Sequence, residues 1–169
     1  ELKRGKNEYV LTRPARLKNL PVFAKESFRN YVQSAKGEYW FGMTEKGVLY
    51  WNQSKDLMVH LEHKSSDKSS LGNDVINLIG FDRDSTNILV GTDSGFSIIK
   101  RSTLAIQNFY PRARIGAAGL NNRYVYDFYD DGKKFWLTTY GGGINSIDKR
   151  TGSLKYYTTT EGLCSDGVY

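Results

Sequence analysis

The sequence predicts an all-β protein in which similar four-stranded antiparallel sheets follow one another along the chain. A short motif recurs three times, and its first residues, Trp40, Leu89 and Trp136, lie 49 and 47 residues apart. Clusters of Gly, Asn and Asp separate short apolar runs, which is typical of strands joined by turns. The 169 residues include 12 Tyr, 8 Phe and 17 Gly but only 3 Pro. No long stretch has the 3.6-residue period of a helix.

The repeated motif is an apolar strand followed by a short turn that ends in glycine. Its copies read WFGMTEKGV from Trp40, LVGTDSGF from Leu89 and WLTTYGGGI from Trp136. The period is longer than that of ankyrin or leucine-rich repeats and close to one four-stranded blade of a β-propeller. We therefore expect about three and a fraction β-propeller blades, each a four-stranded antiparallel sheet, from a larger propeller.

The flanks of the motif repeat as well and mark the boundaries of the units. A Leu and a polar turn precede each unit, an Asp- or Gly-rich turn follows its first strand, and a last strand begins near Leu57, Leu104 or Leu154. Residues 64–70 (KSSDKSS) form a polar loop between two units. Residues 1–27 form a basic leader or, alternatively, supply a strand of a neighbouring blade. The expected blades are 28–64, 71–112 and 120–160, and residues 163–169 begin an incomplete fourth blade.

The net charge of +6 is concentrated at the start of the chain. Residues 1–29 hold eight basic and three acidic side chains, which gives +5 in that segment. A nucleic-acid surface would need basic residues interleaved with stacking aromatics over a continuous face, so we expect no direct nucleic-acid partner. No apolar run reaches the roughly 18 residues of a membrane span. The single cysteine, Cys164, allows no internal disulfide.

Metal and nucleophile motifs are weak in this sequence, and we expect no metal, no cofactor and no catalytic residue. His60 and His63 are three residues apart on a predicted strand and therefore point to opposite faces. The run from Asp82 to Asn87 has part of the spacing of a calcium loop but lacks the closing glutamate, which favours a β-turn. Cys164 has no histidine in its repeat element to act as a base.

The recurring residues are expected to be structural. Trp40, Leu89 and Trp136 are predicted to pack between blades, and Gly42 and Gly91 to allow close approach of neighbouring sheets. The run of three glycines at 141–143 is followed by a strand rather than by a helix with an adjacent lysine, which excludes a phosphate cradle. Instead, Gly142 or Gly143 is expected to supply the positive φ of a hairpin turn. The predicted turn glycines are Gly47, Gly95 and Gly143.

The third unit, GLNNRYVYDFYDDGKKFWLTTYGGGINSIDKRTGSLKYYTTT, resembles the two-component regulator propeller repeat. The second unit matches with Leu89 in place of tryptophan, and the first is more divergent, with Met43 where threonine is usual. The resemblance covers roughly residues 28–169. It implies the periplasmic sensor region of a hybrid two-component histidine kinase that recognises an oligosaccharide. The kinase, the transcriptional output and the inner-membrane anchor would then lie outside this chain.

In propellers, the loop that leads into a blade and the turn between its second and third strands share one face, where ligands usually bind. Aromatic faces and planar polar side chains are the groups that bind sugars. The candidate residues in the lead-in loops are Asn73, Asp74, Asn122, Arg123, Tyr124, Ser165 and Asp166. Those in the inner turns are Glu45, Lys46, Asp93, Ser94 and Tyr140.

Two other functions remain open on the sequence. A propeller can act as a protein-interaction scaffold, and some propellers of similar repeat are lyases or glycosidases. The enzyme hypothesis is the weaker, because it needs an acid and a base in the ligand layer and no histidine is expected there. The expected partners are an oligosaccharide and further blades, either of the parent protein or of a second copy, packed on the open blade edges.

Overall fold

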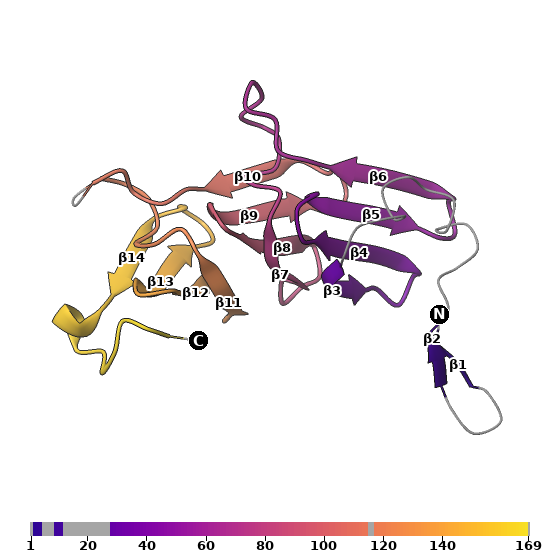
Figure 1. Cartoon of the computed structure of the whole chain (residues 1–169). Coiled ribbons are helices and arrows are strands. Elements are labelled where there is room, and N and C mark those ends of the chain that lie inside the picture. The colour runs from indigo at the N-terminus through magenta and orange to yellow at the C-terminus, as the bar shows by residue number, and fades with distance from the viewer. Residues whose placement is uncertain (1, 5–8, 12–27, 115–116, 169) are drawn as a thin grey trace.

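The computed structural model describes residues 2–4, 9–11, 28–114 and 117–168. It contains three four-stranded antiparallel sheets with strands in sequence order, which we call blades 1, 2 and 3 (Figure 1). Blade 1 comprises β3 (Phe28–Gln33), β4 (Glu38–Met43), β5 (Val48–Asn52) and β6 (Leu57–Leu61). Blade 2 comprises β7 (Ile76–Phe81), β8 (Asn87–Thr92), β9 (Gly95–Lys100) and β10 (Ile106–Phe109). Blade 3 comprises β11 (Val125–Asp130), β12 (Lys134–Thr139), β13 (Gly143–Asp148) and β14 (Leu154–Tyr157).

Among the described residues, β1 (Leu2–Arg4), β2 (Tyr9–Leu11) and η2 (Thr159–Glu161) lie outside the blades. Strands β1 and β2 pair with each other in a separate sheet. Most of the predicted basic leader otherwise falls outside the described residues. The 3-10 turn η2 follows β14 and begins at a capping box on Thr158.

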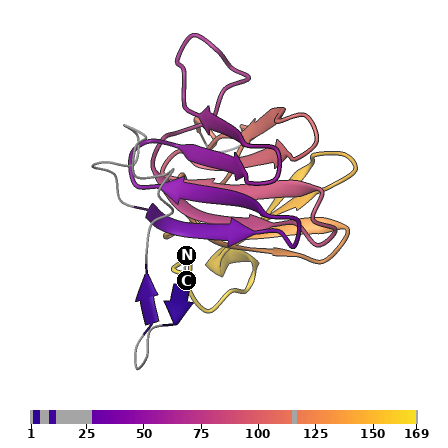
Figure 2. The same ribbon diagram turned by 90° about the vertical axis from the view of Figure 1, so that its right-hand side faces the viewer.

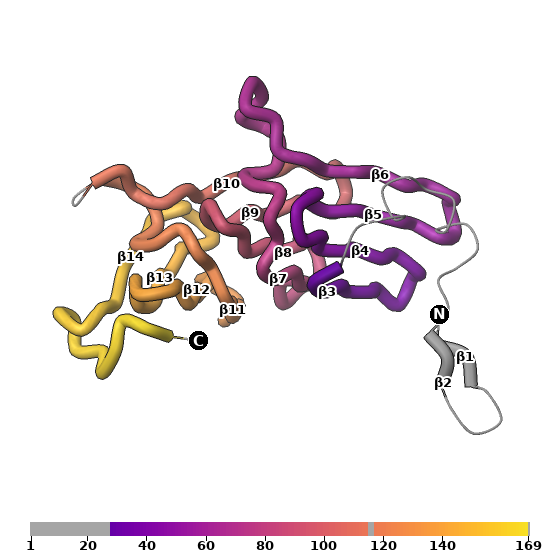
Figure 3. The backbone as a smooth tube through the Cα atoms, in the orientation of Figure 1, coloured from indigo at the N-terminus to yellow at the C-terminus, as the bar shows by residue number. Residues whose placement is uncertain are grey.

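The blades stand side by side with their first strands adjacent. Strand β7 contacts both β3 and β11, and these three strands lie along one side of the array (Figures 1 and 3). Viewed from the end, the sheets lie one behind another (Figure 2). This is the arrangement of propeller blades around an axis, with the first strand of each blade innermost. The predicted all-β blade architecture is therefore confirmed.

The inner turns depend on glycine for two reasons. Gly47 and Gly143 have φ of 68° and 66°, in the region that side chains disfavour. A Cβ at Gly47 would also lie 2.2 Å from the carbonyl oxygen of Leu61, and one at Gly143 would lie 2.1 Å from that of Tyr157. The turn therefore packs directly on the end of the fourth strand, and this explains why glycine recurs there.

Neighbouring blades enclose two apolar cores. Trp40 is fully buried between blades 1 and 2, and Leu89 is fully buried between blades 2 and 3. The sheets approach closely at Gly42, where an added Cβ would lie 2.7 Å from the side chain of Ile76. Gly91 has the same role, since its Cβ would meet the backbone oxygen of Val125 at 3.0 Å. Neighbouring sheets therefore approach closely at both glycines.

Trp136 differs from its repeat equivalents. It is only half-buried and does not belong to either core, because no further sheet of the described chain covers that side of blade 3. Its ring instead packs 5.6 Å from the ring of Tyr157, and its Nε1 donates to Asp131 at 2.7 Å. The prediction that Trp136 packs between two blades is therefore not met within these residues.

Candidate functional site

The first strand of every blade carries a β-bulge at the same place. The register shifts between Phe28 and Asn30 in blade 1, and at the equivalent points in blades 2 and 3. The extra residue in each strand is Arg29, Asn77 or Tyr126. A bulge rotates a side chain out of the regular alternation and is common next to functional sites. None of these three residues was among the sequence-predicted candidates.

Each bulged side chain in blades 2 and 3 meets the first residue of the inner turn of the same blade. In blade 2, Asn77 Nδ2 donates to Asp93 Oδ1 at 2.9 Å. In blade 3, the rings of Tyr126 and Tyr140 meet edge-on with centroids 6.1 Å apart. In both blades, the bulged residue of the first strand therefore contacts the turn between the second and third strands, where candidate ligand-binding residues were predicted.

Further contacts join the three blades at this end. Arg29 of blade 1 donates to Asn77 Oδ1 at 2.8 Å. Arg123, in the loop that leads into blade 3, donates from Nε to the carbonyl oxygen of Asp93 at 3.0 Å. The result is a continuous row of polar and aromatic side chains across the inner strands, which we call the rim cluster: Arg29, Asn77, Asp93, Arg123, Tyr124, Tyr126 and Tyr140.

The rim cluster presents aromatic surface to solvent. Tyr126 and Tyr140 are 43% and 49% exposed. The guanidinium carbon of Arg123 lies 4.5 Å from the ring centroid of Tyr124, a cation–π contact. Gly141, beside Tyr140, has no other atom within 4 Å of the position where a Cβ would lie. The glycine-rich turn is therefore open to solvent at Gly141.

Several other predicted residues form the lead-in loops themselves. Asn73 Oδ1 accepts from the N–H of Val75 at 2.8 Å, and Asn122 Oδ1 accepts from that of Tyr124 at 3.1 Å. Ser165 Oγ makes the same bond two residues ahead, to Gly167, at 3.1 Å. These are side-chain-to-backbone turns at one repeat position. Asn73 Nδ2 also donates to Ser94 Oγ at 3.1 Å, which fixes the loop against the turn of blade 2.

Asp74 and Asp166 hold their loops against the preceding blade. Asp74 Oδ1 accepts from the N–H of His63 at 2.7 Å, and Asp166 Oδ1 accepts from that of Thr159 at 2.6 Å. Their carbonyl oxygens accept from the turn glycines Gly47 and Gly143, at 2.8 and 2.9 Å. The segment 163–168 is thus seated on blade 3 as the loop of blade 2 is seated on blade 1.

The predicted residues in the turn of blade 1 are not joined to the rim cluster by any hydrogen bond among the described residues. Glu45 and Lys46 are exposed, and no hydrogen bond joins their side chains to the other described residues. The carbonyl oxygen of Lys46 lies 2.6 Å from His60 Nε2. This corrects one expectation, since the fourth strand brings a histidine to the layer of the inner turns. His63 contacts a different carbonyl oxygen, that of Leu71, at 2.8 Å.

The part of the chain that the structure describes contains no group of three or more His, Cys, Asp or Glu arranged to hold a metal ion. The Asp82 carboxylate, 3% exposed, accepts from the backbone N–H groups of Thr86 and Asn87 at 2.8 and 2.9 Å. It is therefore a turn-forming aspartate, as predicted. No helix among the described residues is long and apolar enough to cross a membrane.

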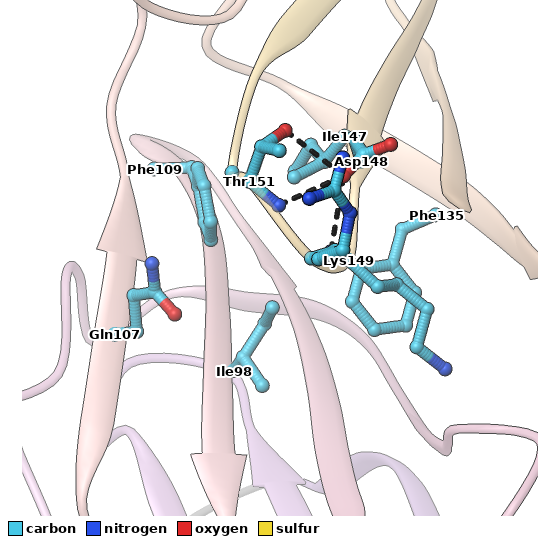
Figure 4. A pocket seen from close by; sticks show the side chains of 10 residues that line it. Ile98, Gln107, Phe109, Phe135, Ile147, Asp148, Lys149 and Thr151 are labelled. Carbon is cyan, nitrogen blue, oxygen red and sulfur yellow. Dashed lines mark hydrogen bonds between the residues drawn. The ribbon is translucent and has the colours of Figure 1, made fainter. Parts of the chain in front are cut away.

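A cavity of about 230 Å³ lies between the outer parts of blades 2 and 3 (Figure 4). Its apolar floor comes from Ile98, Phe109, Phe135 and Ile147, and the turn around Gly152 forms one wall. This cavity is separate from the rim cluster, because the β13–β14 turn is at the opposite end of β13 from the inner turn.

No family model and no curated protein matches the sequence. Solved structures do match. The extracellular domain of the hybrid two-component system BT3049 from B. thetaiotaomicron has a TM-score of 0.65 and 13% identity, over 78% of this chain and 18% of that one. The corresponding domain of BT4673 from the same organism has a TM-score of 0.64 and 20% identity, over 84% of this chain and 20% of that one.

A third match is PorZ of Porphyromonas gingivalis, described as an essential surface component of the type-IX secretion system. It has a TM-score of 0.61 and 19% identity, over 83% of this chain and 22% of that one. The predicted resemblance to the extracellular propeller regions of two-component systems is thus confirmed as a likeness of fold. The chain spans about a fifth of the length of these structures.

Proposed function

We propose that this chain is part of the ligand-binding propeller of a periplasmic sensor, and that the rim cluster contributes to the binding of an oligosaccharide. The proposal is supported by the similarity of fold to extracellular domains of two-component systems. Signalling output, from a histidine kinase to a transcriptional response, would reside elsewhere in the parent protein. In this proposal the chain binds its ligand without chemical change.

The observation that carries the proposal is the convergence of three blades on the rim cluster. Exposed tyrosine rings offer apolar faces for the C–H groups of a pyranose, and planar amide, carboxylate and guanidinium groups offer hydrogen bonds to its hydroxyls. The contacts between Arg29 and Asn77 and between Arg123 and Asp93 fix these groups before ligand arrives. Such preorganisation reduces the entropic cost of binding.

Calorimetric titration of the full-length protein with a panel of defined oligosaccharides tests the proposal. We expect saturable binding of at least one glycan, and recovery of that glycan unchanged by chromatography. Tyr140→Ala is expected to weaken binding about tenfold or more, because it removes one of the exposed rings. The absence of heat with every glycan, from a folded sample, would exclude the proposal.

A protein-binding role is the second candidate, and two observations favour it. The fold is also similar to PorZ, a surface component of a secretion system. The exposed segment 62–69, between β6 and β7, projects from the outer side of the array (Figures 1 and 2). Capture of one stable protein partner without any glycan dependence, lost on shortening of this loop, would favour this role over the sensor.

A further inference from the structure

The two arginines of the rim cluster differ from Arg101 and Lys149 in what they contact. Arg101 pairs with Glu38 across blades 1 and 2, and Lys149 pairs with Asp130 at 2.7 Å. Arg29 and Arg123 make no ion pair with any described residue, although both are exposed. No described carboxylate therefore neutralises Arg29 or Arg123, whereas Arg101 links blades 1 and 2 and Lys149 links two segments within blade 3.

The Arg123 side chain is held in a fixed orientation, and one edge of its guanidinium group makes no hydrogen bond to the described residues. Its Nε donates to the carbonyl oxygen of Asp93, and its guanidinium lies over the Tyr124 ring. Its two terminal nitrogens make no hydrogen bond within the described chain. A guanidinium presents paired N–H donors that match the two oxygens of a carboxylate or sulfate. Orientation by Asp93 and Tyr124 prepares that edge for an anion.

The nearby aspartates do not compete for this edge. Asp93 binds Arg123 through its carbonyl oxygen, while its carboxylate accepts from Asn77 at 2.9 Å. The carboxylates of Asp74 and Asp166 accept from the backbone N–H groups of His63 and Thr159, which follow the last strand of the preceding blade. The carboxylates of Asp74, Asp93 and Asp166 are thus each bonded to another part of the protein.

An aromatic surface begins directly beside Arg123. The N–H of Tyr140 donates to the carbonyl oxygen of Tyr124 at 3.1 Å, so the turn of blade 3 and the lead-in loop run side by side. Tyr140 and Tyr126 then extend the row. A ligand that contacts both Arg123 and this row must combine an anionic group with a ring that can stack on tyrosine.

We infer that the rim cluster is selective for anionic oligosaccharides, with the carboxylate or sulfate bound by Arg123 and a neighbouring sugar ring on Tyr140 and Tyr126. This inference rests on the proposed function, because it names the class of glycan that the same site binds. Arg29, held by Asn77, supplies a second positive charge for a longer chain of acidic sugars.

The test compares three probes by calorimetry on the full-length protein: trigalacturonate, a sulfated heparin disaccharide and neutral maltotriose. We expect one of the two anionic probes to bind at least about tenfold more tightly than maltotriose. The affinity of the anionic probe should fall as the salt concentration rises, because salt screens the attraction between its anionic group and Arg123. Trigalacturonate identifies a uronic acid as the source of the charge, and the heparin disaccharide identifies a sulfate.

Variants locate the interaction. Arg123→Gln is expected to weaken the anionic probe about tenfold or more, as for loss of a charge-assisted hydrogen-bonded pair, and to weaken maltotriose by a smaller factor. Arg150→Gln is the matched control, since Arg150 is exposed in the turn at the other end of β13. Circular dichroism checks that each variant is folded.

The outcomes separate the inference from the proposed function. If maltotriose binds as tightly as both anionic probes, or if Arg123→Gln leaves anionic binding unchanged, the inference is wrong while glycan sensing stands. If no member of a wider glycan panel binds the folded protein, the proposed function fails and the inference fails with it.

Discussion

Leu104 and Gly152 occupy the same position in blades 2 and 3, with φ of 60° and 71°. Each donates its N–H to the carbonyl oxygen four residues earlier, at 2.8 Å in both blades. The Leu104 side chain packs against the core between blades 1 and 2. Gly152 has no side chain, and the cavity of Figure 4 lies beside it. The cavity between blades 2 and 3 thus lies beside a glycine, at the repeat position where blade 2 has a leucine that packs against a core.

This relationship predicts an unusual order of stability for variants of Leu104. Leu104→Ala loses buried surface and keeps the unfavourable positive φ, so it should cost about 2 kcal/mol. Leu104→Gly loses slightly more surface but relieves the backbone, which recovers about 1 kcal/mol. We expect urea unfolding to rank wild type above the glycine variant and the glycine variant above the alanine variant. The reverse order of the two variants would contradict the left-handed assignment.

A second prediction concerns the ion pair between Lys149 and Asp130, whose side chains are 21% and 4% exposed. Burial alone would raise the pKa of Asp130, but hydrogen bonds from Lys149 and from the N–H groups of Arg83 and Gly132 outweigh it and lower the pKa. Lys149→Met leaves a buried carboxylate without its cation and should cost about 2–3 kcal/mol in urea unfolding. The double variant Lys149→Met with Asp130→Asn should lose less. Equal losses would show that the charge is not the cause.

A third prediction is acid sensitivity at Asp131. The hydrogen bond from Trp136 Nε1, with those from the N–H groups of Lys134 and Lys133, lowers the pKa of Asp131 to about 2. Because the folded state favours the ionised form, this stabilisation is present above the unfolded pKa of about 3.9 and is lost as pH falls toward 2. The urea midpoint should therefore drop between about pH 4 and pH 2, and Asp131→Asn should flatten that drop. An unchanged slope in the variant would assign the effect to other carboxylates.

A fourth prediction tests whether Asp74, in the loop that leads into blade 2, has a structural role or a ligand-binding role. Asp74→Ala removes the acceptor for the N–H of His63 and should destabilise the protein by about 1 kcal/mol. Asp74→Asn retains an oxygen acceptor and should cost less. Because the Asp74 carboxylate is hydrogen-bonded to the backbone of His63, we expect both variants to bind glycan with the affinity of the wild type in calorimetry. A loss of glycan affinity with unchanged stability would instead indicate that Asp74 contacts the ligand.

A fifth prediction concerns the uncovered face of blade 3, where Tyr129 is 65% exposed beside half-buried Trp136. The equivalent faces of blades 1 and 2 are covered by the next blade, so a polypeptide of residues 1–169 should self-associate through this face. Tyr129→Lys should increase the monomer fraction in light scattering. The control is Tyr110→Lys, since Tyr110 is 46% exposed outside this face. A wild-type polypeptide that is a stable monomer with cooperative melting would contradict the prediction.

Some of the candidate residues chosen from the sequence lie in the rim cluster, and others form the loops that support it. Arg123, Tyr124, Tyr140 and Asp93 were predicted from their loops and do lie in the rim cluster. Asn73 and Asn122 form the loop turns instead, because a short amide side chain reaches the N–H two residues ahead. The same residue types suit a turn and a sugar site, so type and position alone could not separate the two roles.

The sequence by itself determined the blade, because its period, turn glycines and apolar strands act locally in every copy. It also determined where the sheets approach closely, through Gly42 and Gly91. Only the tertiary structure decided which side chains meet at the rim cluster. Arg29, Asn77 and Tyr126 differ in type, and they share a role because a bulge places each of them. Each bulge is set by the register against the next strand of its own blade, whereas the contact that joins Arg29 to Asn77 links residues 48 positions apart in the chain.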